Sequence, residues 1–213
     1  MTVAYDSSVV RFYYFEMLGT AVFAITGVLA VTRRGLDVFG ALVLGIVTAL
    51  GGGTVRDVIV GAQPFWIHDF NYVWVASAGA LTAFWIGEVF RNGQRALLYF
   101  DALGAALFAI TAANKVLLLQ FGGPVAVAMG VLTGIGGGLI RDVLAGRPTL
   151  LMSREVYATP ILLGCVAFVL LRAEAPSFPY AATVGFTIIF GARAFAIHRH
   201  LEMPMWLTHR EPD

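Results

Sequence analysis

Residues 51–58 of the chain read GGGTVRDV, and residues 136–143 read GGGLIRDV. Further upstream, LGTAVFAIT at residues 18–26 matches LGAALFAIT at residues 103–111. Both pairs are 85 residues apart (136 − 51 and 103 − 18), so a single register relates the two halves of the chain. Self-similarity that holds one offset over this length indicates a structural repeat.

The composition places these repeats in lipid. Of the 213 residues, 59% are hydrophobic and 13% are charged, and the mean hydropathy is +0.81. Soluble domains use roughly 45–50% apolar and about 25% charged residues. The formal charge of +1 comes from scattered basic residues, which excludes a nucleic-acid-binding protein. The sequence contains no apparent nucleophile, phosphate-binding loop or metal-ligand spacing, so we predict no enzyme, no metal site and no cofactor.

The apolar runs predict an all-α polytopic membrane protein with seven transmembrane helices. Their approximate ranges are residues 13–32, 37–60, 70–90, 97–119, 123–146, 155–171 and 178–197. Each 85-residue unit contains three crossings, so the second copy enters the bilayer from the opposite side and the repeats are inverted. The predicted organisation is one transmembrane domain over residues 1–213, which divides into a first three-helix repeat at 13–96, a second at 97–172, a seventh helix at 178–197 and a tail at 198–213.

The basic residues between the spans predict the orientation. Eight arginines fall in the loops and tail on one side of the predicted bundle, and three basic residues fall on the other. Cytoplasmic loops carry the excess of Lys and Arg. We therefore expect the N-terminus outside and the C-terminal tail in the cytoplasm.

The glycine triplets are unfavourable inside a helix, since each glycine costs up to about 1 kcal/mol relative to alanine. We expect the pore helices to break there and to expose carbonyl groups. Unwound backbone at membrane depth survives only inside protein or beside a water-filled cavity. The competing interpretation is that small residues let two helices approach closely. The residues concerned are Gly51, Gly52, Gly53, Gly136, Gly137 and Gly138.

An arginine and an aspartate follow each triplet: Arg56, Asp57, Arg141 and Asp142. Charged residues within spans face the bundle interior or a wet cavity. One hypothesis is that the aspartates line a pore and favour cations while the arginines tune its charge and gate. The other is that all four only lock the repeats together through ion pairs. In either case the arginines can reach carboxylates on other helices, with Glu88 and Asp101 as candidates.

Other charged residues have plainer interpretations. Glu16 and Asp101 are equivalent in the repeats and lie near the openings of spans one and four, where a helix N-terminus accommodates a carboxylate. Lys115 is the only lysine, and we expect it to snorkel to the interface, although a voltage-sensing or ligand-sensing role in a cavity is the alternative. We also expect Arg193 to snorkel, and Cys165 to pack as a small hydrophobe.

The doubled GGGxxRDV motif in a seven-span chain resembles the prokaryotic branch of the trimeric intracellular cation (TRIC) channels, over residues 14–197. The resemblance implies a homotrimer in a bacterial or archaeal inner membrane. It implies a pore in each protomer, formed by inverted repeats with glycine-kinked second helices, that conducts monovalent cations such as K⁺ and Na⁺. We expect membrane lipids to surround such a trimer. Animal members have a lysine-bearing, phosphoinositide-linked motif, whereas residues 44–50 are uncharged here, so we expect no regulation by that route.

Two other function classes stay open. Carbonyls and carboxylates attract cations, whereas helix N-termini and arginines attract anions, so the residues alone leave the sign of the permeant species undecided. Bacterial members of the family also carry a glycine-transporter-like label, which makes a secondary transporter of glycine or another small amino acid the alternative. A purely structural scaffold explains the small residues but not paired charges at matching depths.

Overall fold

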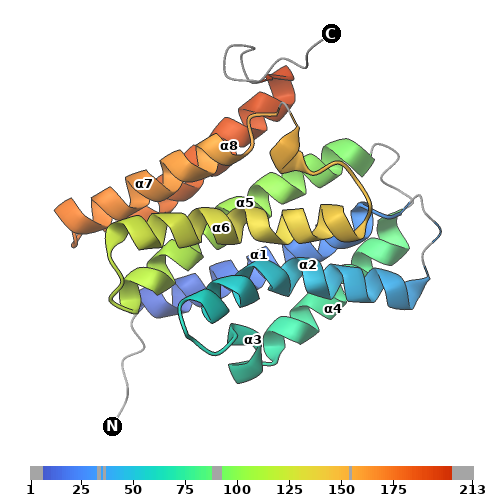
Figure 1. The fold of residues 1–213 in the computed structure, drawn as a ribbon, viewed down its shortest axis with the longest axis horizontal. Coiled ribbons are helices and arrows are strands. Elements are labelled where there is room, and N and C mark those ends of the chain that lie inside the picture. The colour runs from blue at the N-terminus through green and yellow to red at the C-terminus, as the bar shows by residue number, and fades with distance from the viewer. Residues whose placement is uncertain (1–6, 33–34, 36, 88–92, 154, 203–213) are drawn as a thin grey trace.

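The structure is a computed structural model that describes residues 7–32, 35, 37–87, 93–153 and 155–202. Over these residues the chain forms a helical bundle (Figure 1). Its elements are α1 (Ser7–Leu29), α2 (Val38–Ile59), α3 (Phe65–His68), α4 (Asn71–Ile86), α5 (Gly93–Leu118), α6 (Gly123–Leu144), the 3₁₀ turn η2 (Leu150–Met152), α7 (Ala158–Glu174) and α8 (Ala181–Arg199).

Five of these helices are long and apolar enough to cross a membrane: Val10–Leu29, Val38–Ile59, Gln94–Leu118, Gly123–Leu144 and Ala181–Arg199. The third and sixth predicted spans correspond to α4 and α7, with 16 and 17 residues. At 1.5 Å per residue these two helices are about 24–26 Å long, somewhat less than the roughly 30 Å hydrocarbon core. The predicted all-α membrane fold is confirmed.

The bundle consists of two three-helix units that face each other. In one unit α1, α2 and α4 pack together, and in the other α5, α6 and α7 do. Across the interface α1 packs on α5 and α2 on α6, while α8 packs on α5 and α7. Equivalent helices run in opposite directions, most plainly α2 and α6 (Figure 1). The repeats are inverted, and α8 has no counterpart among the described elements.

The prediction that the glycine triplets break their helices is wrong. Helix α2 runs without interruption through residues 51–53, and α6 runs through residues 136–138. In a membrane interior no water is available to bond freed N–H and C=O groups, so the chain keeps its internal hydrogen bonds. The helical cost of glycine is offset by close packing of the two helices, which was the competing interpretation.

Both helices end a turn after the Arg–Asp pair, in the same way. The N–H of Ala62 donates to the Asp57 carbonyl, and the N–H of Arg147 donates to the Asp142 carbonyl, each at 2.8 Å. Between them lie Gly61 at φ 70° and Gly146 at φ 53°, in the left-handed conformation that glycine adopts without strain. The tight turns lead into α3 and η2, two short elements at equivalent positions that the apolar pattern did not predict.

Candidate functional site: two inverted charge clusters

The centre of the bundle is the crossing of α2 and α6. A Cβ atom added to Gly52 would lie 2.7 Å from the Thr133 carbonyl oxygen, and one added to Gly137 would lie 2.6 Å from the Thr48 carbonyl oxygen. These distances are too short for any side chain. The crossing therefore requires glycine at both positions, and the two contacts are equivalent under the 85-residue offset.

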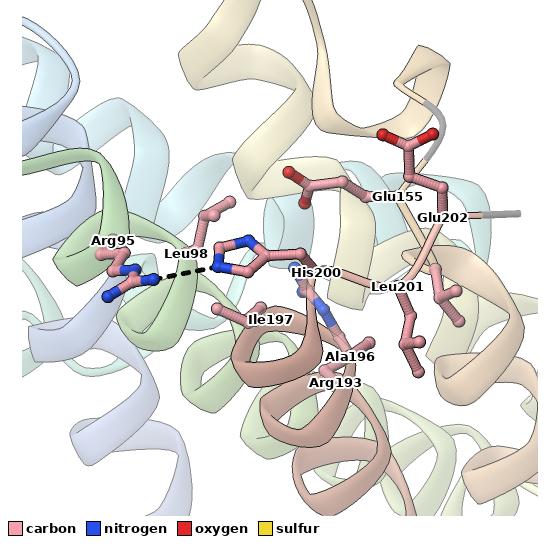
Figure 2. A pocket seen from close by; sticks show the side chains of 10 residues that line it. Arg95, Leu98, Glu155, Arg193, Ala196, Ile197, His200, Leu201 and Glu202 are labelled. Atoms are coloured by element: carbon pink, nitrogen blue, oxygen red, sulfur yellow. Dashed lines mark hydrogen bonds between the residues drawn. The ribbon is translucent and has the colours of Figure 1, made fainter.

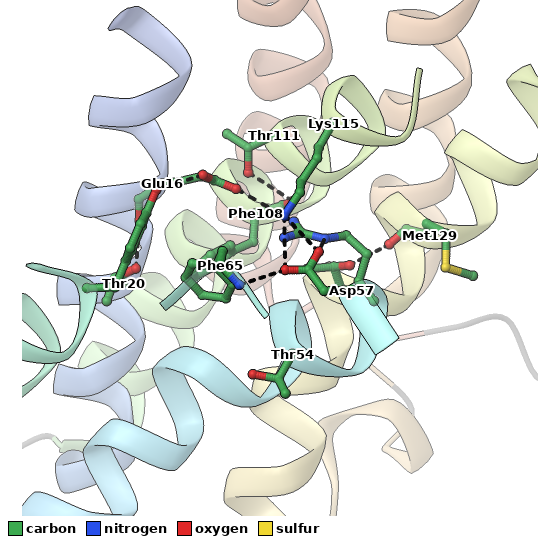
Figure 3. A network of polar contacts seen from close by, with 12 residues as sticks. Glu16, Thr20, Thr54, Asp57, Phe65, Phe108, Thr111, Lys115 and Met129 are labelled. Atoms are coloured by element: carbon green, nitrogen blue, oxygen red, sulfur yellow. Dashed lines mark hydrogen bonds and ion pairs between the residues drawn. The ribbon is translucent and has the colours of Figure 1, made fainter. Parts of the chain in front are cut away.

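A first cluster of charged side chains lies on one side of this crossing (Figure 3). Its centre is Asp57, which is fully buried. The Asp57 carboxylate accepts hydrogen bonds from Arg56 Nε at 2.8 Å and from the Phe65 N–H at 2.9 Å. Lys115 Nζ lies 2.9 Å from both carboxylate oxygens. The Lys115 side chain is 30% exposed on the protomer, and its ammonium group caps a buried carboxylate.

Glu16 completes the first cluster. Its carboxylate accepts a hydrogen bond from the Tyr72 hydroxyl at 2.9 Å, and Arg56 Nη1 approaches it at 3.6 Å. Among the described residues neither Nη1 nor Nη2 of Arg56 has a hydrogen-bond partner, although Arg56 is fully buried. The Phe65 ring lies 5.7 Å from the guanidinium carbon. The Arg56 guanidinium group is therefore ion-paired with Glu16 and Asp57, but two of its nitrogen atoms make no hydrogen bond to the described residues.

A second cluster lies on the other side of the crossing and is built from the equivalent positions. Asp142 accepts from Arg141 Nε at 2.9 Å and from the Leu150 N–H at 3.1 Å. Asp101 is fully buried between two arginines, since Arg141 Nη1 and Arg193 Nη1 each donate to it at 2.8 Å. Tyr157, the counterpart of Tyr72, lies with its ring 4.2 Å from the Arg193 guanidinium carbon.

The two clusters differ in the origin of their fourth charge. In each, one Arg and two carboxylates come from equivalent repeat positions and carry a net charge of −1. Lys115, from α5 of the other repeat, neutralises the first cluster. Arg193, from the unpaired helix α8, neutralises the second and is nine-tenths or more buried. The side chain that carries the first counter-charge is partly exposed, and the side chain that carries the second is buried.

The structure corrects two expectations and supports two others. Lys115 and Arg193 do not snorkel. Each pairs instead with a carboxylate of a cluster whose other three charged side chains sum to −1: Lys115 with Asp57, and Arg193 with Asp101. Asp101 is the partner of Arg141, as the sequence analysis proposed. Glu88, the other candidate, lies outside the described residues. Cys165 is fully buried and packs as a small hydrophobe, as expected.

Sequence reasoning missed Tyr72 and Tyr157, because a tyrosine in an apolar span reads as an ordinary core or interface ring. The signal that could have found them is their own offset of 85 residues (157 − 72). No group of three or more His, Cys, Asp or Glu residues able to hold a metal occurs in the described part of the chain.

A cavity of about 120 Å³ opens at the end of α8, beside the second cluster (Figure 2). Arg193, which binds Asp101 of the second cluster, is one of the residues that line this cavity. Arg95 Nη2 lies 2.9 Å from His200 Nε2. A guanidinium group only donates, so this contact needs an unprotonated Nε2. Burial raises the pKa of the Glu155 carboxyl, which also lines the cavity.

Comparison with known proteins agrees with this geometry. Residues 13–88 and 98–173, again 85 residues apart, match the sequence family described as "Glycine transporter". The "UPF0126 membrane protein" of Vibrio cholerae is 41% identical over 203 residues, covering 94% of this chain and 84% of the relative. The "UPF0126 inner membrane protein YadS" of Escherichia coli is 39% identical, covering 90% and 94% respectively.

Solved structures give the same relationship. The TRIC trimeric intracellular cation channel orthologue from Rhodobacter sphaeroides superposes with a TM-score of 0.87 at 36% identity, over 90% of this chain and 99% of that one. A structure described under conductance through TRIC cation channels matches with a TM-score of 0.81 at 31% identity, over 94% and 98%. With both halves matched by one family and the whole fold shared at this identity, the chain belongs to the prokaryotic TRIC family, whose sequence pattern is described as "Glycine transporter".

Proposed function

We propose that the protein is a channel for monovalent cations such as K⁺, with a pore inside each protomer of a homotrimer. Its similarity to solved TRIC cation channels, one of them described as trimeric, supports the class and the assembly. The inner membrane of a prokaryotic cell is the proposed location, since a bacterial relative is named as an inner membrane protein. The excess of loop arginines supports an outside N-terminus and a cytoplasmic tail.

The observation that carries the proposal is the position of Lys115. Its ammonium group lies 2.9 Å from both oxygens of Asp57 and is the accessible member of the first cluster. Without it, Glu16, Arg56 and Asp57 leave one uncompensated negative charge. A monovalent cation entering from that side has the same charge and competes for the same carboxylate. Lys115 thus acts as a tethered counter-ion that a permeant cation displaces.

The remaining predicted residues have places on this path. Asp57 and Asp142 favour cations at its two ends, and Arg56 and Arg141 hold those carboxylates and keep each end from accumulating negative charge. The glycines at residues 51–53 and 136–138 have no side chains, so the backbones of α2 and α6 can come into contact between the two ends of the path. The cavity beside Arg193 is the approach to the second cluster from the end of α8.

Single-channel recording of Lys115→Ala in a planar bilayer tests this role. Removing the tethered ammonium frees Asp57 for a permeant cation, so we expect a several-fold higher single-channel conductance or open probability at low K⁺ concentration. Lys115→Arg keeps the charge and is the matched control, with wild-type-like currents. Equal currents in Lys115→Ala and wild type would show that the Lys115–Asp57 pair lies off the conduction path.

A secondary transporter of glycine or another small amino acid is the second candidate. Asp57 and Glu16 are acceptors for an ammonium group. Nη1 and Nη2 of Arg56, which have no hydrogen-bond partner in the described part of the chain, are donors for a carboxylate, so one zwitterion fits both. This candidate predicts saturable uptake of labelled glycine into proteoliposomes, competed by unlabelled glycine and abolished in Arg56→Gln. Flux that rises linearly with glycine concentration would exclude a carrier.

A further inference from the structure

Two aromatic rings meet at the centre of the molecule, where the inverted repeats face each other. Phe23 of α1 and Phe108 of α5 stack with ring centroids 5.4 Å apart and an interplanar angle of 14°. They are 85 residues apart, so they are the same position in the two repeats. The side chains are 1% and 2% exposed. The stack is therefore a contact of one residue position with its own inverted copy.

Sequence spacing places this stack between the two charge clusters. On α5, Asp101, Phe108 and Lys115 follow one another at steps of seven residues. Seven residues are close to two helical turns, so these side chains share one face of α5 at intervals of about 10 Å. Asp101 belongs to the second cluster and Lys115 to the first. Phe108 thus lies about midway between them.

Helix α1 runs in the opposite direction and has a related spacing, which ends one residue beyond the helix. Glu16, Phe23 and Ala30 also follow at steps of seven residues. Glu16 belongs to the first cluster, and the Ala30 carbonyl accepts a hydrogen bond from Arg147 at 3.1 Å, at the opposite end of the bundle. Helix α5 therefore presents a charged, an aromatic and a charged side chain in turn, while the antiparallel α1 presents Glu16 and Phe23 and is followed by the Ala30 carbonyl, which binds a charged side chain.

Glycine positions around the rings determine where the rings can lie. A Cβ atom added to Gly19 would lie 3.3 Å from the Phe108 ring, and one added to Gly104 would lie 3.1 Å from the Phe23 ring. A Cβ atom at Gly137, in the α2–α6 crossing, would lie 3.5 Å from Phe23. The rings occupy the space that these missing side chains leave, next to the thinnest part of the bundle.

Resting on the proposed channel function, we propose that the Phe23–Phe108 stack is the gate of the pore. Apolar constrictions gate by losing water, and an ion that sheds its hydration in an apolar layer pays a large free-energy penalty. On the proposed path, a cation that leaves the first cluster passes the two rings before it reaches the second. Stacked rings close the path, and conduction requires them to separate.

Single-channel recording of Phe23→Ala and Phe108→Ala tests the gate. Each truncation removes one half of the apolar layer, so we expect at least a tenfold increase in open probability at zero voltage, and a further increase in the double variant. Phe168→Ala is the matched control, because Phe168 is a fully buried phenylalanine of α7, a helix that contributes no ring to the stack. It should gate like the wild type.

The outcomes separate this inference from the channel itself. If the wild type passes no cation current, the proposed function fails. If the wild type conducts, and both stack variants gate like the wild type and Phe168→Ala, the channel stands and the gate is wrong.

A second variant keeps the test decisive if alanine prevents folding. Phe108→Cys in a Cys165→Ala background carries one thiol, since Cys165 is the only cysteine of the chain. A small cationic methanethiosulfonate reagent should reach this thiol only when the channel opens, and should then block the current. The control is Phe168→Cys in the same background, which should not react. Conduction that persists in an open channel while the thiol of the Phe108→Cys variant stays unmodified would contradict the gate.

Discussion

At the scale of single residues, the stability of the two clusters depends on whether their buried positive and negative charges cancel. Breaking a buried ion pair by removing one partner costs roughly 3–5 kcal/mol, because the other charge stays buried and uncompensated. Asp101 shares its two oxygens between Arg141 and Arg193. The same reasoning explains why the side chains of Lys115 and Arg193 turn inward rather than toward the lipid headgroups.

Arg193→Leu tests that balance. The change leaves the second cluster with a net charge of −1, so we expect a loss of about 3–5 kcal/mol in stability, measured as a lower midpoint of thermal unfolding in detergent. Arg172→Leu is the control, since Arg172 lies in the last turn of α7, outside both clusters, and it should shift the midpoint little. Equal shifts in the two variants would return Arg193 to a snorkelling role.

At the scale of helices, the glycine triplets set the distance between α2 and α6 and do not interrupt either helix. The triplets in α2 and α6 stay helical, and Gly52 and Gly137 allow the backbones to touch at their crossing. The charged residues that follow one turn later are thereby held at fixed depth on each side of the contact. Helix α8 adds a stabilising charge to the second repeat alone, which makes the two ends of the inverted pair unequal.

Gly137→Ala tests the close approach. The new Cβ atom would lie 2.6 Å from the Thr48 carbonyl oxygen, so α2 and α6 must move apart. Overpacking of this kind typically costs about 1–3 kcal/mol, again measured by thermal unfolding in detergent. Gly191→Ala in α8 is the matched control, because apart from its chain neighbours and its own helix backbone no described heavy atom lies within 4 Å of the added Cβ. A Gly137→Ala protein as stable as Gly191→Ala would show that the crossing has room for a side chain.

At the scale of the whole molecule, the sequence predicted the helical membrane fold and the inversion, because both depend on hydropathy and on an exact offset. It placed Arg56, Asp57, Arg141 and Asp142 correctly as buried charges for the same reason. It failed where the outcome depends on packing between distant segments. Whether a glycine triplet bends a helix or tightens a crossing depends on the helix that faces it.

The residue that supplies the fourth charge of each cluster could not be predicted from the sequence, for a related reason. Lys115 and Arg193 have no equivalents in the other repeat, so internal similarity carries no signal for them. Hydropathy placed both near the ends of their spans, where snorkelling is the ordinary outcome. Only the fold brings Lys115 to Asp57 and Arg193 to Asp101.

The measurement that tests cation conduction most directly is the reversal potential of purified wild-type protein in a planar bilayer under a tenfold KCl gradient. Two carboxylate-centred clusters predict discrete current steps that reverse near the K⁺ equilibrium potential, about 59 mV in magnitude for one monovalent ion. Reversal near the Cl⁻ potential would contradict cation conduction and show that the arginines dominate. No current, together with saturable glycine uptake into liposomes, would make the protein a carrier instead.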